Sequence, residues 1–174
     1  MTAPGPGATT AGRASSGPTV GIGQIVASAD HGVVICALGL GSCIGLVLTD
    51  PQAGVAGMAH VMLPASRPGA DGPPGKFADT AVPALIDQVT RLGALRVRLQ
   101  AWMAGGAQMF GGDGGAPMLN IGERNVRAVR EALGAAGIRV RAADTGGVAG
   151  RSMHVAVARG AVTVRAVGGE PIGL

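Results

Sequence analysis

Short apolar segments separated by Gly-rich turns run along the chain from Thr19 onward, a pattern typical of β-strands. The β-branched runs TVGIGQIVA and GVVICAL lie on either side of the turn-like SADHG, so we expect strands at 19–27 and 32–38. The apolar runs CIGLVLTD and GVAGMAHVMLP, at 43–50 and 54–64, flank the sequence Asp-Pro-Gln-Ala-Gly. Because Asp-Pro opens a turn and Gly closes it, these two runs are predicted to form a hairpin.

Two segments instead have helical periodicity. Residues 77–93 carry apolar side chains three and four positions apart, with Asp79 as the candidate cap and Pro83 tolerated in or near the first turn. The second helix is predicted to begin after Asn120, whose side chain caps it, and Glu123 can complete a capping box. The side chains expected to face inward from this helix are Val126, Val129 and Leu133.

The rest of the chain adds more strands. Four further segments alternate between apolar and polar residues, which predicts strands with one buried face: 96–104, 138–145, 152–159 and 161–167. The last two are expected to form a hairpin at Arg159–Gly160. Strands outnumber helices and several neighbours are hairpins, so the pattern predicts an α+β fold: a mixed, hairpin-rich sheet layer with two main helices packed on it.

The two ends of the chain differ in composition. Residues 1–18 are almost entirely Gly, Ala, Pro, Ser and Thr, which cannot bury enough surface to offset the entropy of ordering, so a flexible tail is expected. Residues 19–174 are expected to form one domain, a size that encloses a core without disulfides. Aromatic residues make up only 2%, so Ala, Val, Leu, Ile and Met must build that core.

Charge and cysteine content narrow the class of protein. The net charge is +4, but the Arg residues are scattered and have almost no aromatic neighbours, which argues against nucleic-acid binding. An acidic protein partner fits the charge equally well. The two cysteines form no disulfide framework, and no apolar run reaches membrane-spanning length. With no signal peptide at the N-terminus, these features predict a cytoplasmic protein without membrane insertion.

The densest chemical signal is GLGSC, at 39–43, followed by AHVMLP, at 59–64. Cys43 follows a Gly-rich turn in which the amides of Gly41 and Ser42 can point at an oxyanion, and such surroundings are expected to lower the pKa of a thiol. His60 lies across the predicted hairpin and can serve as a base. On spacing alone, a buried cysteine and a core histidine remain the better interpretation of this pair.

Other residues have weaker claims. Cys36, inside VVICAL, is predicted to pack in the core, and a metal site formed with Cys43 and His60 lacks the close ligand pairs of structural zinc sites. The Gly-rich turns AGGAQMF, at 104–110, and DTGG, at 144–147, follow strands and are candidate cleft loops. Gly105 and Gly106 are candidate oxyanion donors or plain turn residues. Arg151 is a candidate contact to the substrate backbone, or a loop cation with a salt partner. Ser152 is a candidate substrate contact. GERN, at 122–125, is interpreted as helix capping.

Several of these motifs together resemble the CheD chemoreceptor glutamine deamidases. LGLGSC, GMAHVMLP, GKFADTAV, AGGAQMF, NIGERN and DTGG with Arg151-Ser152 stand in that family's order and spacing, from about Val20 to Gly169. The resemblance implies an α/β sandwich shared with bacterial cysteine-dependent deamidating toxins, with Cys43 and His60 as catalytic residues. It also implies conversion of glutamine to glutamate on chemotaxis receptors without a cofactor, and a CheC-type phosphatase as a partner.

The chain departs from the family at one important position. The family has a third catalytic residue, a threonine six positions before the cysteine, and this chain has Ala37 there. A threonine hydroxyl orients the imidazole, so in this chain a backbone carbonyl or a water has to replace it. Otherwise the chain is a weak enzyme, or an inactive adaptor that binds receptors or a CheC-type partner. A deamidase with a target other than a receptor and a metal-binding module are the remaining hypotheses.

Overall fold

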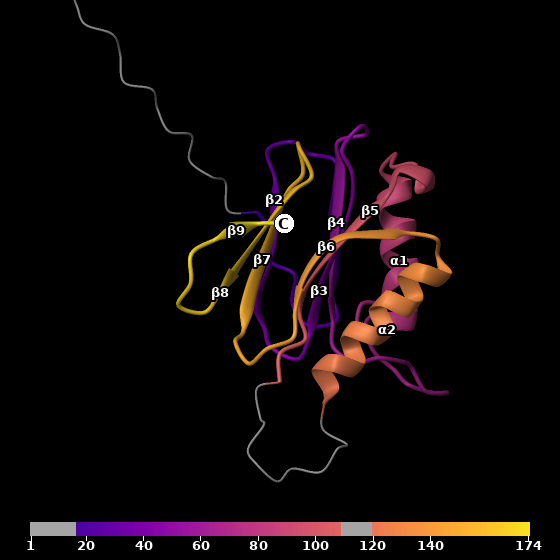
Figure 1. Cartoon of the computed structure of the whole chain (residues 1–174). Coiled ribbons are helices and arrows are strands. Elements are labelled where there is room, and N and C mark those ends of the chain that lie inside the picture. Colours follow the sequence, from indigo (N-terminus) through magenta and orange to yellow (C-terminus); the bar gives the residue numbers. More distant parts are fainter. Residues whose placement is uncertain (1–16, 109–119) are drawn as a thin grey trace, which may run out of the picture.

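Two β-sheets stack face to face, and two helices cover the outer face of the larger sheet (Figure 1). The structure, a computed structural model, describes residues 17–108 and 120–174. Most of the predicted flexible tail therefore lies outside the described residues, as do Met109 and Phe110 of the AGGAQMF segment.

Twelve elements make up the described chain. In order they are β1 (Ile25–Ser28), β2 (Val34–Leu40), β3 (Ile44–Asp50), β4 (Val55–Val61), α1 (Ala78–Arg91), the 3₁₀ turn η1 (Arg96–Arg98), β5 (Gln100–Gly105), α2 (Ile121–Ala135), β6 (Arg139–Thr145), β7 (Arg151–Ala156), β8 (Ala161–Ala166) and β9 (Ile172–Gly173).

The larger sheet has five strands in the order β1-β4-β3-β5-β6, all antiparallel except the parallel pair β5–β6, which α2 connects. The smaller sheet is antiparallel, in the order β2-β7-β8-β9. The predicted hairpins β3–β4 and β7–β8 are both present. The α+β class with two helices is thus confirmed, and the strands divide into two layers: a sandwich with helices on one side only (Figure 1).

Both faces of the central hairpin are covered, which explains its nearly continuous apolar sequence. Every residue of β3 and β4 is buried. Alternation sends Leu46 and Leu48 toward the helices, while Val47 and Met58 pack against the smaller sheet. We call the space between the two sheets the interlayer. Its contents matter because the same alternation directs the candidate site residues into it.

Three local predictions were wrong. Asp79 does not cap α1: Phe77 is the N-cap without a side-chain bond, and the Asp79 carboxylate accepts hydrogen bonds from the N–H and hydroxyl of Ser66. The strand predicted over 19–27 begins only at Ile25, whereas Pro83 lies in the second turn of α1, near the first turn as predicted. The strand predicted from residue 96 begins only at Gln100, because the preceding residues form η1.

An ion pair between Asp50 and Arg98 explains why residues 96–98 form η1 instead of the start of a strand. Asp50, at the end of β3, is fully buried. Its carboxylate accepts hydrogen bonds from Nε and Nη2 of Arg98, with an Nη2–Oδ2 distance of 2.7 Å. Backbone N–H groups of Gln52, Ala53 and Leu95 complete its set of donors. Burial alone would raise the pKa of this carboxyl, but the hydrogen bonds from Arg98 and then from the Leu95 and Ala53 amides lower it overall.

Candidate active site

Cys43 and His60 lie on the same face of the larger sheet, in the interlayer. His60 on β4 pairs directly with Gly45 on β3, and Cys43 precedes Gly45 by two residues. Because side chains two apart share a face, extending the β3 register by one residue puts Cys43 diagonally across from His60. The packing agrees: Cys43 contacts the interlayer cluster, and a Cβ on Gly45 would meet Leu40 and Met153 of that same cluster.

His60 is held in one tautomer by the backbone. Its ring is 3% exposed, and Nδ1 lies 3.1 Å from the carbonyl oxygen of Val20. Since a carbonyl can only accept, Nδ1 must carry the proton, which leaves Nε2 as the unprotonated nitrogen. Nε2 is buried and has no hydrogen-bond partner among the described residues. A buried, unpartnered proton acceptor is what a general base presents before its substrate arrives.

Burial keeps both groups neutral at rest. It raises the pKa of the half-buried Cys43 thiol and lowers the pKa of His60, with the Val20 carbonyl opposing that second shift only in part. The expectation that the surroundings lower the thiol pKa is therefore wrong for the resting protein. A neutral thiol beside a neutral imidazole suits proton transfer during attack, rather than a preformed ion pair.

The segment 41–43 presents its amides and has its carbonyls occupied. Ala107 N–H donates to the Gly41 carbonyl at 2.8 Å, and Gly106 N–H donates to the Cys43 carbonyl at 2.9 Å. The Ser42 carbonyl accepts from the side chain of Asn125 at 2.9 Å. By contrast, no described residue accepts a hydrogen bond from the N–H groups of these three residues. Amides without a described acceptor next to a thiol are candidate donors to an oxyanion.

Gly105 and Gly106 approach this segment closely, and their geometry favours the predicted turn role over that of oxyanion donors. Both have positive φ, 109° and 69°. A side chain on Gly105 would collide with the Cys43 carbonyl, and one on Gly106 would meet Val126 at 2.5 Å. Because the Gly106 N–H is already bound to Cys43, it is not a free oxyanion donor. These glycines shape the backbone around Cys43.

The structure resolves the two interpretations of Arg151. Its guanidinium donates to the carbonyls of Gly146 and Ala149 and forms an ion pair with Asp144 at 2.9 Å, so it is a loop cation with a salt partner. The side chain thereby secures the DTGG turn. Ser152, next along β7, points to the opposite face of the smaller sheet from Arg151, away from the interlayer, and does not join the site.

Cys36 and Ala37 also lie on opposite faces of the smaller sheet. Ala37 is fully buried in the interlayer, where its pairing partner on β7 is Met153. Cys36 is half-buried on the outer face, opposite His154 and 3.3 Å from the Thr19 hydroxyl, so the prediction that it packs in the core was wrong. Among the described residues no group of three or more His, Cys, Asp or Glu is placed to hold a metal.

Two groups that contact this site were not predicted from the sequence. One is the Val20 carbonyl, which no side-chain pattern reveals. The other is Asn125, interpreted only as part of a capping segment, whose Nδ2 reaches the carbonyls of both Ser42 and Met62. A signal was present, because Asn125 occupies an inward-facing position of α2 in line with Val129 and Leu133.

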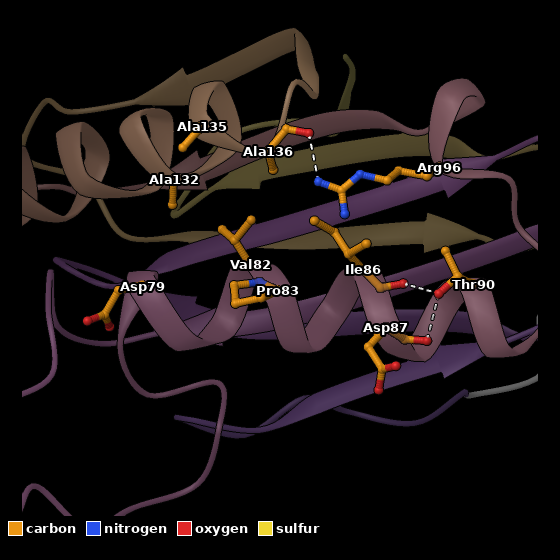
Figure 2. Close-up of a pocket in the computed structure, with 10 residues that line it drawn as sticks. All are labelled: Asp79, Val82, Pro83, Ile86, Asp87, Thr90, Arg96, Ala132, Ala135 and Ala136. Atoms are coloured by element: carbon orange, nitrogen blue, oxygen red, sulfur yellow. Dashed lines mark hydrogen bonds between the residues drawn. The ribbon is translucent and has the colours of Figure 1, made fainter.

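A cavity of about 650 Å³ lies between the two helices and away from these residues. Figure 2 shows Val82 and Ile86 pointing from α1 toward Ala132 and Ala136 of α2, with Arg96 donating to the Ala136 carbonyl. The small alanines leave this groove open. None of the candidate catalytic residues lines it.

Comparison with known proteins identifies the family. A family model described as CheD chemotactic sensory transduction matches residues 62–166. The match begins two residues after His60, so it includes Asn125 and Arg151 but not Cys43.

Of the described helices, none has the length and apolar content needed to cross a membrane.

Relatives cover more of the chain. The chain is 49% identical over 132 residues to the probable chemoreceptor glutamine deamidase CheD of Desulforamulus reducens, covering 75% of this chain and 80% of the relative. It is 46% identical over 150 residues to the chemoreceptor glutamine deamidase CheD of Thermotoga maritima, covering 86% and 92%. A probable CheD of Methanococcus maripaludis is 43% identical over 126 residues, covering 72% and 80%. On this evidence the chain belongs to the CheD family.

Proposed function

We propose that this chain is a protein-glutamine deamidase that acts on chemotaxis receptors, with Cys43 as the nucleophile and His60 as the base. One observation carries the proposal: a neutral imidazole with a buried, unpartnered Nε2 shares a sheet face with a thiol beside unused backbone amides. The relatives named above as chemoreceptor glutamine deamidases support the choice of substrate.

Acylation begins when the glutamine side chain enters beside Cys43. His60 Nε2 takes the thiol proton as sulfur forms a bond to the amide carbon, and the N–H groups of Gly41 to Cys43 stabilise the oxyanion. The imidazolium then gives that proton to the amide nitrogen. The carbon–nitrogen bond breaks, ammonia leaves, and a thioester joins Cys43 to the substrate.

Deacylation reverses these roles with water in place of ammonia. His60 takes a proton from water as its oxygen attacks the thioester carbon, and returns the proton to sulfur as the carbon–sulfur bond breaks. The product is glutamate and the thiol is restored. The Val20 carbonyl supports both half-reactions, because it keeps the Nδ1 proton in place and stabilises the transient imidazolium.

The receptor's cytoplasmic helices are the expected binding partner, which places the reaction in the cytoplasm. The net charge of +4 favours a partner with an acidic surface. A CheC-type phosphatase as a second partner remains a prediction from the family.

Mass spectrometry of a receptor cytoplasmic fragment incubated with the purified chain tests the proposal directly. We expect glutamine-to-glutamate conversion that Cys43→Ala abolishes, and conversion that survives this substitution would disprove the nucleophile. The pKa of His60 lies below its usual 6.5, so the imidazole stays an acceptor as the pH falls to that value. The acid limb of kcat/KM should accordingly lie below pH 6.5, where protonation of His60 removes the base.

A receptor-binding adaptor without turnover is the alternative, and Ala37 is the observation that favours it. With alanine at this position no side-chain hydroxyl orients the imidazole. The hydrogen bond from His60 to Val20 supports activity instead, since it supplies the orientation that alanine cannot. Capture of the receptor fragment with no release of ammonia would establish the adaptor.

A further inference from the structure

Asn125 is a fully buried amide on the inward face of α2. The other buried residues of this helix are Gly122, Val129 and Leu133, so a polar side chain here is an exception that its contacts must explain.

Its contacts join the two halves of the proposed catalytic pair. Nδ2 donates to the Ser42 carbonyl and to the Met62 carbonyl, both at 2.9 Å. Ser42 directly precedes Cys43, and Met62 follows His60 by two residues. Both donor hydrogens of one amide group are thus used on the two backbone segments that carry the thiol and the imidazole.

These hydrogen bonds form just beyond the end of the β3–β4 ladder, where the two strands no longer pair with each other. The β3–β4 ladder ends at the pair Ile44–Val61. Beyond it the N–H of Met62 turns to the Lys76 carbonyl, while Cys43 is bound through its carbonyl to Gly106 on the other side. The two segments would be free to separate at this point, and the Asn125 amide bridges them.

The helix is able to reach this far because of a glycine one turn earlier. A Cβ on Gly122 would collide with the Gly106 carbonyl and lie 3.0 Å from the Ala107 carbonyl. Without a side chain there, the first turn of α2 packs directly on the loop after β5. That close approach brings Asn125 within hydrogen-bonding distance of Ser42.

We propose that Asn125 is a positioning residue that sets the separation of Cys43 and His60 by donating to the carbonyls of Ser42 and Met62. The inference rests on the proposed function, because it concerns how the same pair works. Misplacement of reacting groups by about 1 Å can cost on the order of 10²-fold in rate, so a bridge at this position affects chemistry as well as folding.

The test compares alkylation of Cys43 by iodoacetamide, followed by peptide mass spectrometry, across pH in the wild-type chain and in Asn125→Asp. The carboxyl group has the shape of the amide but, when ionised, no hydrogen to donate to either carbonyl. In the wild-type chain we expect His60→Gln to slow the alkylation of Cys43 near neutral pH. In Asn125→Asp we expect the Cys43 rate to fall by about tenfold or more and to become insensitive to His60→Gln.

Two controls separate positioning from general damage. Cys36 lies on the outer face of the smaller sheet, so its alkylation in the same samples should not change. Asn120→Ala removes the cap of the same helix without touching Ser42 or Met62, and should leave the His60 dependence intact. If Asn125→Asp does not fold, Asn125→Ala, which leaves both carbonyls to water, takes its place with the same expectation.

The inference is overturned if a folded Asn125 variant keeps the wild-type dependence of Cys43 alkylation on His60. It is equally overturned if the wild-type chain shows no such dependence, because there is then no pair to position. Failure of the proposed function has a separate signature: the receptor fragment is not deamidated, while the alkylation pattern still depends on Asn125.

Discussion

The two ends of strand β3 both bury polar groups, and they differ in whether those groups have partners. At one end, Asp50 has donors for both carboxylate oxygens, from Arg98 and three backbone amides. At the other end, near Cys43, stand two of the four buried polar side-chain atoms that lack a partner in the described chain, Nε2 of His60 and Oδ1 of Asn125. The other two are Nε of Arg151, on β7, and the Thr49 hydroxyl, beside Asp50.

This difference indicates that one end of β3 serves stability and the other end serves the candidate site. A buried polar group without a partner costs stability, on the order of 1–3 kcal/mol, and persists where the group has a task beyond folding. The Asp50 end secures the hairpin against the segment before β5. In the proposed function, the Cys43 end keeps an acceptor and several amides available for a substrate. Substitutions at the two ends should therefore separate activity from stability.

The largest expected effect is at the unpartnered end. His60→Gln should lower kcat by roughly 10²–10⁴, the usual contribution of a positioned acid–base group. Its amide can still donate to Val20, and no contact of Nε2 is lost, so the free energy of unfolding should change by less than about 1 kcal/mol. Ammonia release and urea unfolding measure the two quantities. A large loss of stability would mean that His60 is a structural residue after all.

Asp50→Ala should have the opposite profile. Removing the Asp50 carboxylate leaves three backbone amides without their acceptor, which should cost about 1–3 kcal/mol, while the partly exposed Arg98 can turn to solvent. The activity of the molecules that remain folded should be unchanged. Asp87→Ala, which breaks only the exposed pair with Arg91 on α1, is the matched control and should cost no more than about 0.5 kcal/mol. Equal losses of stability in the two variants would contradict the structural role of Asp50.

A pair of glycines on the two strands of the hairpin sharpens the comparison further. A Cβ on Gly45 would meet Leu40 at 2.8 Å in the interlayer, and one on Gly57 would meet Val89 at 2.7 Å on the helix side. Each substitution to Ala crowds a flexible side chain and should cost about 1–2 kcal/mol of stability. Only Gly45→Ala, which stands opposite His60, should also lower kcat. Equal effects on kcat would show that crowding anywhere in this sheet impairs the site.

How far the sequence predicts this arrangement depends on whether the deciding contacts are local. The β3–β4 hairpin and α2 follow from an Asp-Pro…Gly turn and an Asn cap, signals that act within a few residues. The division into two sheets follows from β2 pairing with β7, more than a hundred residues later, and no local pattern encodes that choice. The same distant pairing decides that Cys36 faces outward.

The site itself was predicted in part for a similar reason. The family motifs and the predicted hairpin were enough to pair Cys43 with His60 on one face of the sheet. The groups that hydrogen-bond to this site come from elsewhere in the chain: the Val20 carbonyl precedes β1, the Asn125 amide lies on α2, and the Gly106 N–H follows β5. Backbone groups have no sequence signature, and the two interpretations of Arg151 could be separated only by the fold of the DTGG turn, which brings Asp144 to its guanidinium.

The smallest expected effect on kcat is at Ala37, the position where the family has threonine. If the Val20 carbonyl already orients the imidazole, Ala37→Thr should change kcat by less than about tenfold, well short of what a missing acid–base group costs. Because Ala37 is fully buried against Met153, the added atoms should lower stability by about 1–3 kcal/mol. Ala37→Val has nearly the shape of threonine without the hydroxyl, so the ratio of kcat between the two variants isolates the hydrogen bond from the crowding. A ratio near one would mean that Val20 suffices. A large gain confined to Ala37→Thr would mean that the carbonyl is a poor substitute and that this chain works with an incompletely held base.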